Sequence, residues 1–341
     1  MSDFQTVPGF EDVWRSRAGP RRVRPRAVLA PHRADMSVGP RLARVAGRAP
    51  EVMVKVTGRT RDPGHLRAHM DYICRNGALE MEDRDGAVLD SRAAVRELAD
   101  DWADLAHADP RRRANSPVTL SLVLSMPAAT EPTLVRDAAS AFARDMFADR
   151  FDYAFALHTD AEHPHVHLEV RALGDGGERL NPKKADLDAW RQAFAQALRD
   201  RGVEAEATPR RARGITRKAE RMPIRRLRER HEAGAAGPAR TVRAAYHEAA
   251  RAALGQDHQR RPWETKLLER QGNVRGLYLA QARLLATSAD PLDRALAARV
   301  ETFVRAMPQP DTRRLALARE IRSANAKLAE ERERPMKSRD R

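Results

Sequence analysis

Residues 151–171, with the sequence FDYAFALHTDAEHPHVHLEVR, hold four of the chain's 11 histidines. Alternate residues of an extended strand point to the same face, so His165 and His167 share one face of a strand. Residues 160–164 fit a tight turn, which would join this strand to the one before it and bring His158 beside the pair. The stretch therefore predicts a β-hairpin that carries three histidines on one face.

Three convergent histidines predict a metal site. Neutral imidazole is a good ligand for a borderline divalent cation, and three protein ligands leave open positions for a substrate oxygen. The alternative is a chance cluster of surface side chains, but the spacing and the two apolar strand patterns around it favour the metal site. The role of the fourth histidine, His163, stays open.

The composition of the chain indicates its partners. A length of 341 residues suits two domains, and the net charge of +15 indicates a polyanionic partner, nucleic acid before membrane. The single cysteine, Cys74, excludes an internal disulfide and fits the reducing cytoplasm. No apolar stretch approaches transmembrane length. We therefore expect a cytoplasmic protein that binds nucleic acid.

Hydrophobic periodicity predicts the order β-α-α-β-α-β-β over residues 51–170, followed by one further helix. The expected strands are 51–57, 118–126, 151–158 and 165–170, and the expected helices are 65–76, 92–107, 131–149 and 185–201. This order predicts an α/β layered domain with a largely antiparallel central sheet flanked by helices. One face of the third strand carries Ala154, Ala156 and His158, and we expect this shallow face to leave room for a substrate.

Three segments follow from this pattern. Residues 1–50 are rich in Arg and Pro without apolar periodicity, which predicts a disordered basic arm. Residues 51–213 form the α/β domain. Strand patterns then end, and residues 214–341 are predicted to form a helical, basic C-terminal region.

A metal site on a protein that binds nucleic acid can support phosphoryl transfer, because the metal polarises a phosphoryl oxygen. This reaction also requires a nucleophile. Of the four tyrosines, Tyr153 lies on the apolar face of a strand, whereas Tyr246 and Tyr278 lie in the helical C-terminal half. Tyr72 is the remaining candidate, because it lies outside the apolar stripe of its helix and has Arg75 beside it to meet a phosphate.

Two neighbours of Tyr72 are weaker candidates for a chemical role. His69 would act as a base or would simply be solvated, and we favour the second interpretation. Cys74 has no recognisable catalytic partner nearby in the sequence.

Several motifs together resemble the relaxases of conjugative and mobilisable plasmids, especially the branch that includes the T-DNA border endonuclease of plant-transforming bacteria. They are MVKVT (53–57), YICRNG (72–77), LEME (79–82) and HTDAEHPHVH (158–167), followed by LNPKK (180–184), WR (190–191) and RGVEAEATPRRARG (201–214). The resemblance covers about residues 51–220, and its histidine motif is the most specific part.

The resemblance implies a single-tyrosine nickase with the HUH fold, which uses Mg²⁺ or Mn²⁺. In that family a tyrosine attacks one phosphodiester at a transfer origin, leaving a 5′-phosphotyrosyl link and a free 3′-OH. Carried over by position, Tyr72 is the nucleophile, and the metal ligands are His158, His165 and His167. Asp160 would orient a ligating imidazole.

The implied partners are single-stranded DNA at a transfer origin, a type IV coupling protein and accessory relaxosome proteins. The expected DNA contacts are Arg75, Lys183, Lys184, Arg210, Arg211 and Arg213. One alternative is a rolling-circle replication initiator, but the tyrosine pair typical of that class does not follow His167. The other is a non-catalytic DNA-binding or secretion-accessory protein.

Overall fold

The computed structural model describes residues 4–15, 37–217, 220, 222–257 and 261–333. They divide into two compact units. The sheet unit contains Phe4 and residues 14–209, and the helical unit contains residues 5–13 and 210–341.

The sheet unit is built on one six-stranded sheet in which every neighbouring pair is antiparallel. The strand order is β1-β4-β6-β5-β2-β3. The strands are β1 (Met53–Thr60), β2 (Met81–Asp83), β3 (Val88–Leu89), β4 (Thr119–Ser125), β5 (Tyr153–His158) and β6 (His165–Arg171). The predicted α/β layered fold with an antiparallel sheet is confirmed. Strands β2 and β3 were not expected, because two or three residues are too few to show an alternating pattern.

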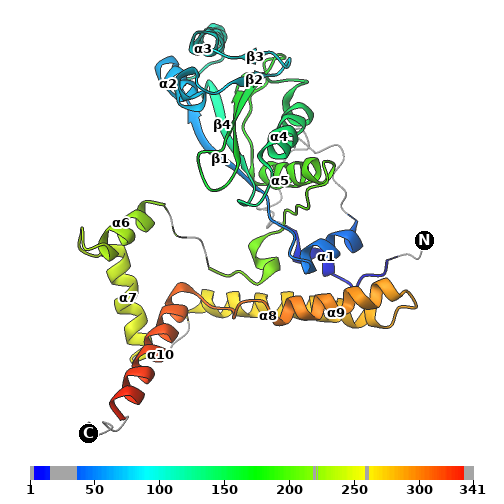
Figure 1. Cartoon of the computed structure of the whole chain (residues 1–341), viewed down its shortest axis with the longest axis vertical. Coiled ribbons are helices and arrows are strands. Elements are labelled where there is room, and N and C mark those ends of the chain that lie inside the picture. The colour runs from blue at the N-terminus through cyan, green and yellow to red at the C-terminus, as the bar shows by residue number, and fades with distance from the viewer. Residues whose placement is uncertain (1–3, 16–36, 218–219, 221, 258–260, 334–341) are drawn as a thin grey trace, which may run out of the picture. The chain divides into compact units, whose positions relative to one another are not determined.

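Helices cover both faces of this sheet (Figure 1). They are α2 (Pro63–Ile73), α3 (Arg92–Ala108), α4 (Pro132–Phe147) and α5 (Lys184–Arg199), whereas α1 (Val38–Ala46) lies outside both sheet cores. The large strand residues pack with α4 and α5 in the main core, where Phe155 and Leu168 meet Phe142 and Trp190. Helices α2 and α3 lie on the other face, which is the face of the histidines.

The small residues of β5 serve helix packing. Ala154 and Ala156 are buried in a second core together with Leu66 and Met70 of α2. The expectation that these two positions leave room for a substrate is therefore wrong. Their short side chains let α2 lie close to the sheet, and this brings the end of α2 beside His158.

The predicted disordered arm is wrong for the part of residues 1–50 that the structure describes. Helix α1 buries Leu42 and Val45, and both Arg41 and Arg44 pair with the buried carboxylate of Glu206, at 3.4 and 3.0 Å. Two apolar residues in a short helix do not produce a periodic signal against an Arg-rich background. The expectation for residues 1–3 and 16–36 lies outside the described residues.

The helical unit contains two helix pairs, α8 (Pro262–Ala286) with α9 (Pro291–Arg305) and α7 (Arg240–Ala253) with α10 (Arg313–Glu333). It also contains helix α6 (Met222–Glu232) and the short 3-10 turns η1 (Phe10–Val13) and η4 (Arg210–Arg213). Tyr278 of α8 packs edge-on against two rings, Phe10 of η1 and Phe303 of α9. The ring centroids are 5.5 Å apart in each pair. Among the described residues, no helix has both the length and the apolar character to cross a bilayer.

A buried carboxylate fixes α2 to α3. Asp71 is only 7% exposed, and it accepts hydrogen bonds from Arg92 at 2.9 and 3.0 Å and from Arg96 at 2.7 Å. The two guanidinium groups hold the pKa of Asp71 far below its usual range. Asp71, which these two arginines hold, directly precedes Tyr72 in the sequence.

Replacing Asp71 with Asn should lower the free energy of unfolding by about 2 kcal/mol at pH 7, because two charge-assisted contacts are lost. The folded-state pKa is depressed, so the carboxylate stabilises fully above the unfolded-state value of about 4, and its contribution is lost as pH falls through the folded-state pKa. The difference between wild type and variant should shrink as pH drops below about 4.

Urea denaturation at several pH values measures this difference. Asp100→Asn is the matched control, since it removes only a more exposed ion pair with Arg67. Equal destabilisation by the two variants at pH 7 would contradict the role of Asp71.

Candidate active site

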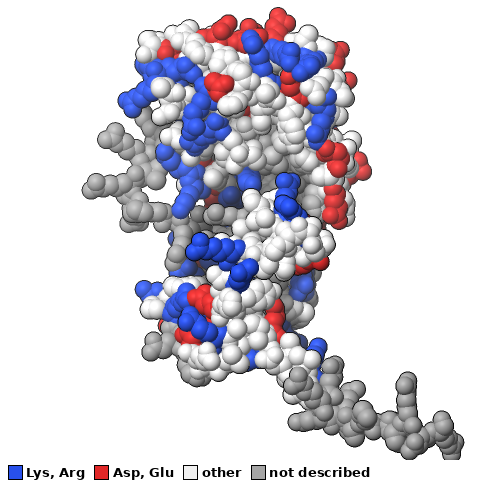
Figure 2. All heavy atoms as spheres, turned by 90° about the vertical axis from the view of Figure 1, so that its left-hand side faces the viewer, with Lys and Arg blue, Asp and Glu red and all other residues white. Residues whose placement is uncertain are grey.

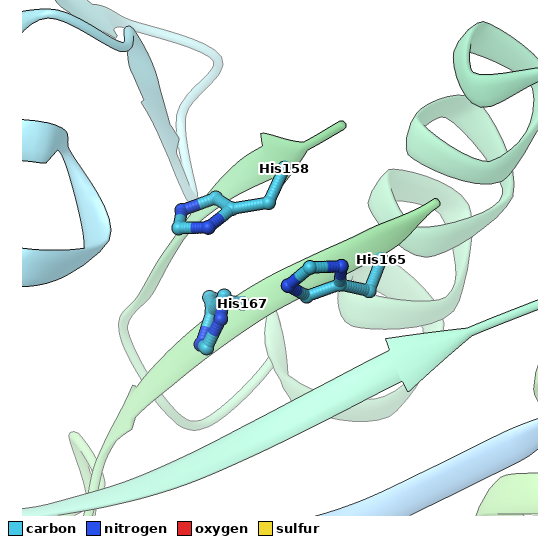
Figure 3. A group of neighbouring side chains, drawn as sticks. All are labelled: His158, His165 and His167. Atoms are coloured by element: carbon cyan, nitrogen blue, oxygen red, sulfur yellow. The ribbon is translucent and has the colours of Figure 1, made fainter. Parts of the chain in front are cut away.

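The histidine hairpin forms as expected. In the β5–β6 register, His158 lies opposite His165 and Ala156 lies opposite His167. The three rings turn toward one shared space (Figure 3), and their centroids are 4.5 to 5.3 Å apart. One ring nitrogen of each lies within 4.8 Å of the others, so the three histidines form one group of candidate ligands for a single cation.

Backbone carbonyls hold two of these rings. Nε2 of His158 donates to the carbonyl of Ile73 at 2.7 Å, and Nδ1 of His165 donates to the carbonyl of His163 at 3.0 Å. A carbonyl oxygen only accepts, so these nitrogens carry the protons and the other nitrogen of each ring keeps its lone pair. This is how proteins orient histidines that bind metals. The donor set therefore fits a divalent metal, and His163 contributes through its backbone.

The surroundings of His167 and His158 favour the neutral form of each ring. Burial, the neighbouring imidazoles and the Arg75 guanidinium lower the pKa of His167 to about 3. Burial also lowers the pKa of His158, against the hydrogen bond to Ile73. Since only neutral imidazole binds a metal, these two shifts favour the form of His167 and His158 that a metal ligand requires.

Tyr72 lies beside the histidines. Its helix begins at the cap residue Asp62 and buries one stripe against the sheet, which leaves Tyr72 on the other side with 51% of its surface exposed. Its ring centroid is 5.9 Å from that of His167 and 6.3 Å from that of His158. The structure therefore brings together the tyrosine and the histidines that the sequence singled out.

The turn after α2 places Arg75 in the same cluster. Arg75 and Asn76 adopt left-handed backbone conformations, with φ of 52° and 57°, which cost about 1 kcal/mol or more in non-glycine residues. Gly77 follows at φ of 92°, where a side chain would collide with the backbone nitrogen of Arg92. The result is that the guanidinium of Arg75 lies 5.1 Å from the ring centre of Tyr72.

Asp160 contacts this arginine. The two side chains form an ion pair, and the same guanidinium nitrogen lies 3.3 Å from Nδ1 of His158. The Asp160 carboxylate itself is 3.9 Å from that ring nitrogen. In this structure the carbonyl of Ile73 orients His158, whereas Asp160 holds Arg75. The expected orienting role of Asp160 thus remains a prediction.

A buried acid on the histidine face was missed. Glu169 follows His167 by two positions on β6, is fully buried, and accepts a hydrogen bond from Thr119. Its other oxygen lies 3.3 Å from Nδ1 of His69, and this contact raises the pKa of His69. His69, whose side chain is 31% exposed, is therefore not simply solvated, and its ring centroid is 6.4 Å from that of Tyr72. The strand alternation that paired His165 with His167 would have revealed Glu169.

The other expected DNA contacts lie elsewhere. Lys183 and Lys184 are exposed at the start of α5, which packs on the opposite face of the sheet from the histidines. Arg210, Arg211 and Arg213 lie in η4 of the helical unit, where Arg210 is exposed. Their contact with DNA remains a prediction.

Comparisons with known proteins agree with this geometry. Residues 72–203 match the family described as relaxase, MobA/VirD2-like, nuclease domain. The T-DNA border endonuclease VirD2 of Rhizobium radiobacter is 28% identical over 186 residues, and that of Agrobacterium fabrum is 27% identical over 185 residues. The first match covers 48% of this chain and 43% of the relative, and the second covers 49% and 41%. The chain thus matches less than half the length of these curated relatives.

A solved structure from "Molecular Basis of Vancomycin Resistance Transfer in Staphylococcus aureus" is also similar. It is 15% identical and covers 47% of this chain and 99% of its own, but at a TM-score of 0.33 this likeness is too weak to support a conclusion. The family match contains Tyr72 and all three histidines, and relaxases generally use a divalent metal. Residues 72–203 of this chain are therefore similar to the nuclease domain of MobA/VirD2-like relaxases.

Proposed function

We propose that this protein nicks one DNA strand at the transfer origin of a plasmid or integrative element. The observation that carries the proposal is the position of Tyr72, whose ring lies 5.9 Å from His167 within a cluster of three convergent histidines. A rolling-circle initiator is less well supported, since the family match is to relaxases. A non-catalytic role would leave this assembly of nucleophile and ligands unexplained.

The reaction is a transesterification. The phenol oxygen of Tyr72 attacks the phosphorus of one phosphodiester and loses its proton. The bond from phosphorus to the 3′ oxygen breaks, and that oxygen takes up a proton to leave as a free 3′-OH. The 5′ phosphate stays on Tyr72, so the bond energy is retained and rejoining needs no ATP.

The surrounding residues bind and orient the phosphate. The guanidinium of Arg75 lies against both Tyr72 and His158, where it can meet a phosphoryl oxygen, and Asp160 holds it there. Mg²⁺ or Mn²⁺ on His158, His165 and His167 would polarise the phosphoryl group and neutralise charge in the transition state.

DNA affinity would come from phosphate contacts outside the cluster. The net charge is +15, and groups of Lys and Arg side chains lie on the face drawn in Figure 2, with acidic groups between them. The contacts that we propose for single-stranded DNA are Lys183, Lys184, Arg210, Arg211 and Arg213. We further propose that the protein acts in the bacterial cytoplasm with accessory relaxosome proteins, and that a type IV coupling protein passes it with the DNA to a recipient cell.

Replacing Tyr72 with Phe should abolish nicking and the covalent adduct while leaving the fold intact. The ring remains and only the hydroxyl is removed, from a side chain that is half exposed. Single-stranded oligonucleotides tiled over the region beside the gene provide the substrates, and mass spectrometry of the adduct locates the attachment. Tyr246→Phe, another exposed tyrosine, is the control. A nucleotide adduct on any residue other than Tyr72 would disprove the assignment.

Replacing both His165 and His167 with Ala should lower Mn²⁺ affinity by at least about 100-fold, because two of three ligands are lost. Nicking should disappear, whereas most DNA binding should remain, since phosphate contacts elsewhere provide it. Calorimetry with Mn²⁺ measures the first effect and a nicking assay with and without EDTA the second. His65→Ala is the control, because His65 is exposed and pairs with Asp62 outside the cluster. Unchanged Mn²⁺ binding by the double variant would contradict the proposed metal site.

A further inference from the structure

The sheet unit has an arginine-lined pocket of about 460 Å³. It lies where β1 ends, where the loop before β4 runs, and where the chain leaves β6. Its polar lining consists of Arg59, Arg111, Arg113, Arg179, Asn115, Ser116 and Asn181. None of these residues belongs to the histidine cluster or to the DNA contacts proposed above.

The pocket is separate from the active site. In the β4–β6 register, Thr119 pairs with Arg171 at the pocket end, whereas Ser125 pairs with His165 at the histidine end. Six residue steps of strand separate these pairs, which corresponds to about 20 Å. A ligand in the pocket therefore does not touch the histidines.

One carboxylate balances part of the charge in the pocket. Asp109 is buried and pairs with Arg111 at 3.2 Å and with Arg179. Among the described residues, Arg59 and Arg113 have no carboxylate partner. The nearest partner of the Arg59 side chain is the amide oxygen of Asn181, at 3.5 Å. Four arginines and one aspartate leave a formal charge of +3.

Backbone contacts fix part of the lining. Arg111 donates a second hydrogen bond to the carbonyl of Gly177 at 2.8 Å. Gly177 has φ of +76°, and a side chain there would collide with the Arg111 guanidinium. The neighbouring acid, Glu178, turns toward Gly174 instead of lining the pocket. The pocket is therefore preorganised, with two arginines held in place and two available for an anion.

We propose that this pocket binds a backbone phosphate of the DNA strand whose cleavage we assign to Tyr72, and this inference rests on that proposed function. Guanidinium groups match phosphate oxygens with paired donors, and Asn115, Ser116 and Asn181 supply neutral groups for the adjoining sugar. A span of about 20 Å corresponds to about six nucleotides at the stacked spacing of 3.4 Å per strand. The pocket would thus hold the strand at a second point and fix its path across the sheet unit.

The test is binding of the full-length protein to a fluorescein-labelled dT20 oligonucleotide at 50 to 200 mM NaCl. Phosphate contacts are independent of sequence, so oligo-dT is a sufficient probe. The double variant Arg59→Ala, Arg113→Ala should bind more weakly, and the magnitude of the slope of log K against log salt should fall by about 0.7, the value for one lost phosphate contact. The variant Arg59→Lys, Arg113→Lys should recover most of the slope.

The matched control is Arg136→Ala with Arg144→Ala, which removes the same charge from exposed positions on α4. Unchanged Mn²⁺ binding by each variant shows that the sheet unit is folded. A salt slope equal to that of wild type, or an equal fall in the control, would overturn the proposal. So would competition by polyglutamate as strong as that of unlabelled dT20, which would assign the pocket to an acidic protein segment. Nicking does not enter this measurement, so a failure of the pocket and a failure of the proposed Tyr72 chemistry remain distinguishable.

Discussion

The hydrogen bond from Nε2 of His158 to the carbonyl of Ile73 joins the two parts of the candidate active site. His158 belongs to the hairpin that carries the histidines, and Ile73 is the last residue of the helix that carries Tyr72. Without this contact, Tyr72 and the three histidines would stand on separate elements with no polar link between His158 and α2. With it, one bond sets the position of the helix end and also leaves Nδ1 of His158 as the nitrogen with a lone pair.

Packing supports this bond from both sides. Ala154 and Ala156 of β5 have short side chains, so Leu66 and Met70 of α2 can pack close to the sheet. On the outer side of α2, Asp71 pairs with arginines of α3. A helix held by apolar contacts beneath and ion pairs beside it has little freedom to slide. The distance between the Tyr72 ring and the histidines is therefore a property of the fold, and it does not depend on one flexible side chain.

The arginines of the sheet unit serve different ends because their partners differ. Arg92 and Arg96 are committed to Asp71, and Arg111 and Arg179 are committed to Asp109. Arg75 pairs with the exposed carboxylate of Asp160 and lies over the Tyr72 ring through a strained turn, where our proposal places a phosphate. A net positive charge thus divides into arginines that stabilise the fold and arginines that remain available to an anion.

Local patterns in the sequence predicted the hairpin, the three histidines and most of the helices and strands. Register in a short hairpin depends on residues a few positions apart, and the apolar stripe of α2 alone excluded Tyr72 from the core. Hydrophobic periodicity did not reveal the short strands β2 and β3 or helix α1, because each contains too few apolar residues to show a period.

Only the tertiary structure decided which distant groups meet. The carbonyl of Ile73 orients His158, His69 pairs with Glu169, and the arginine pocket gathers three chain segments. Each of these contacts joins residues tens of positions apart, and no local periodicity encodes them. They exist because the antiparallel sheet aligns strands β1, β4 and β6, and because α2 packs against it.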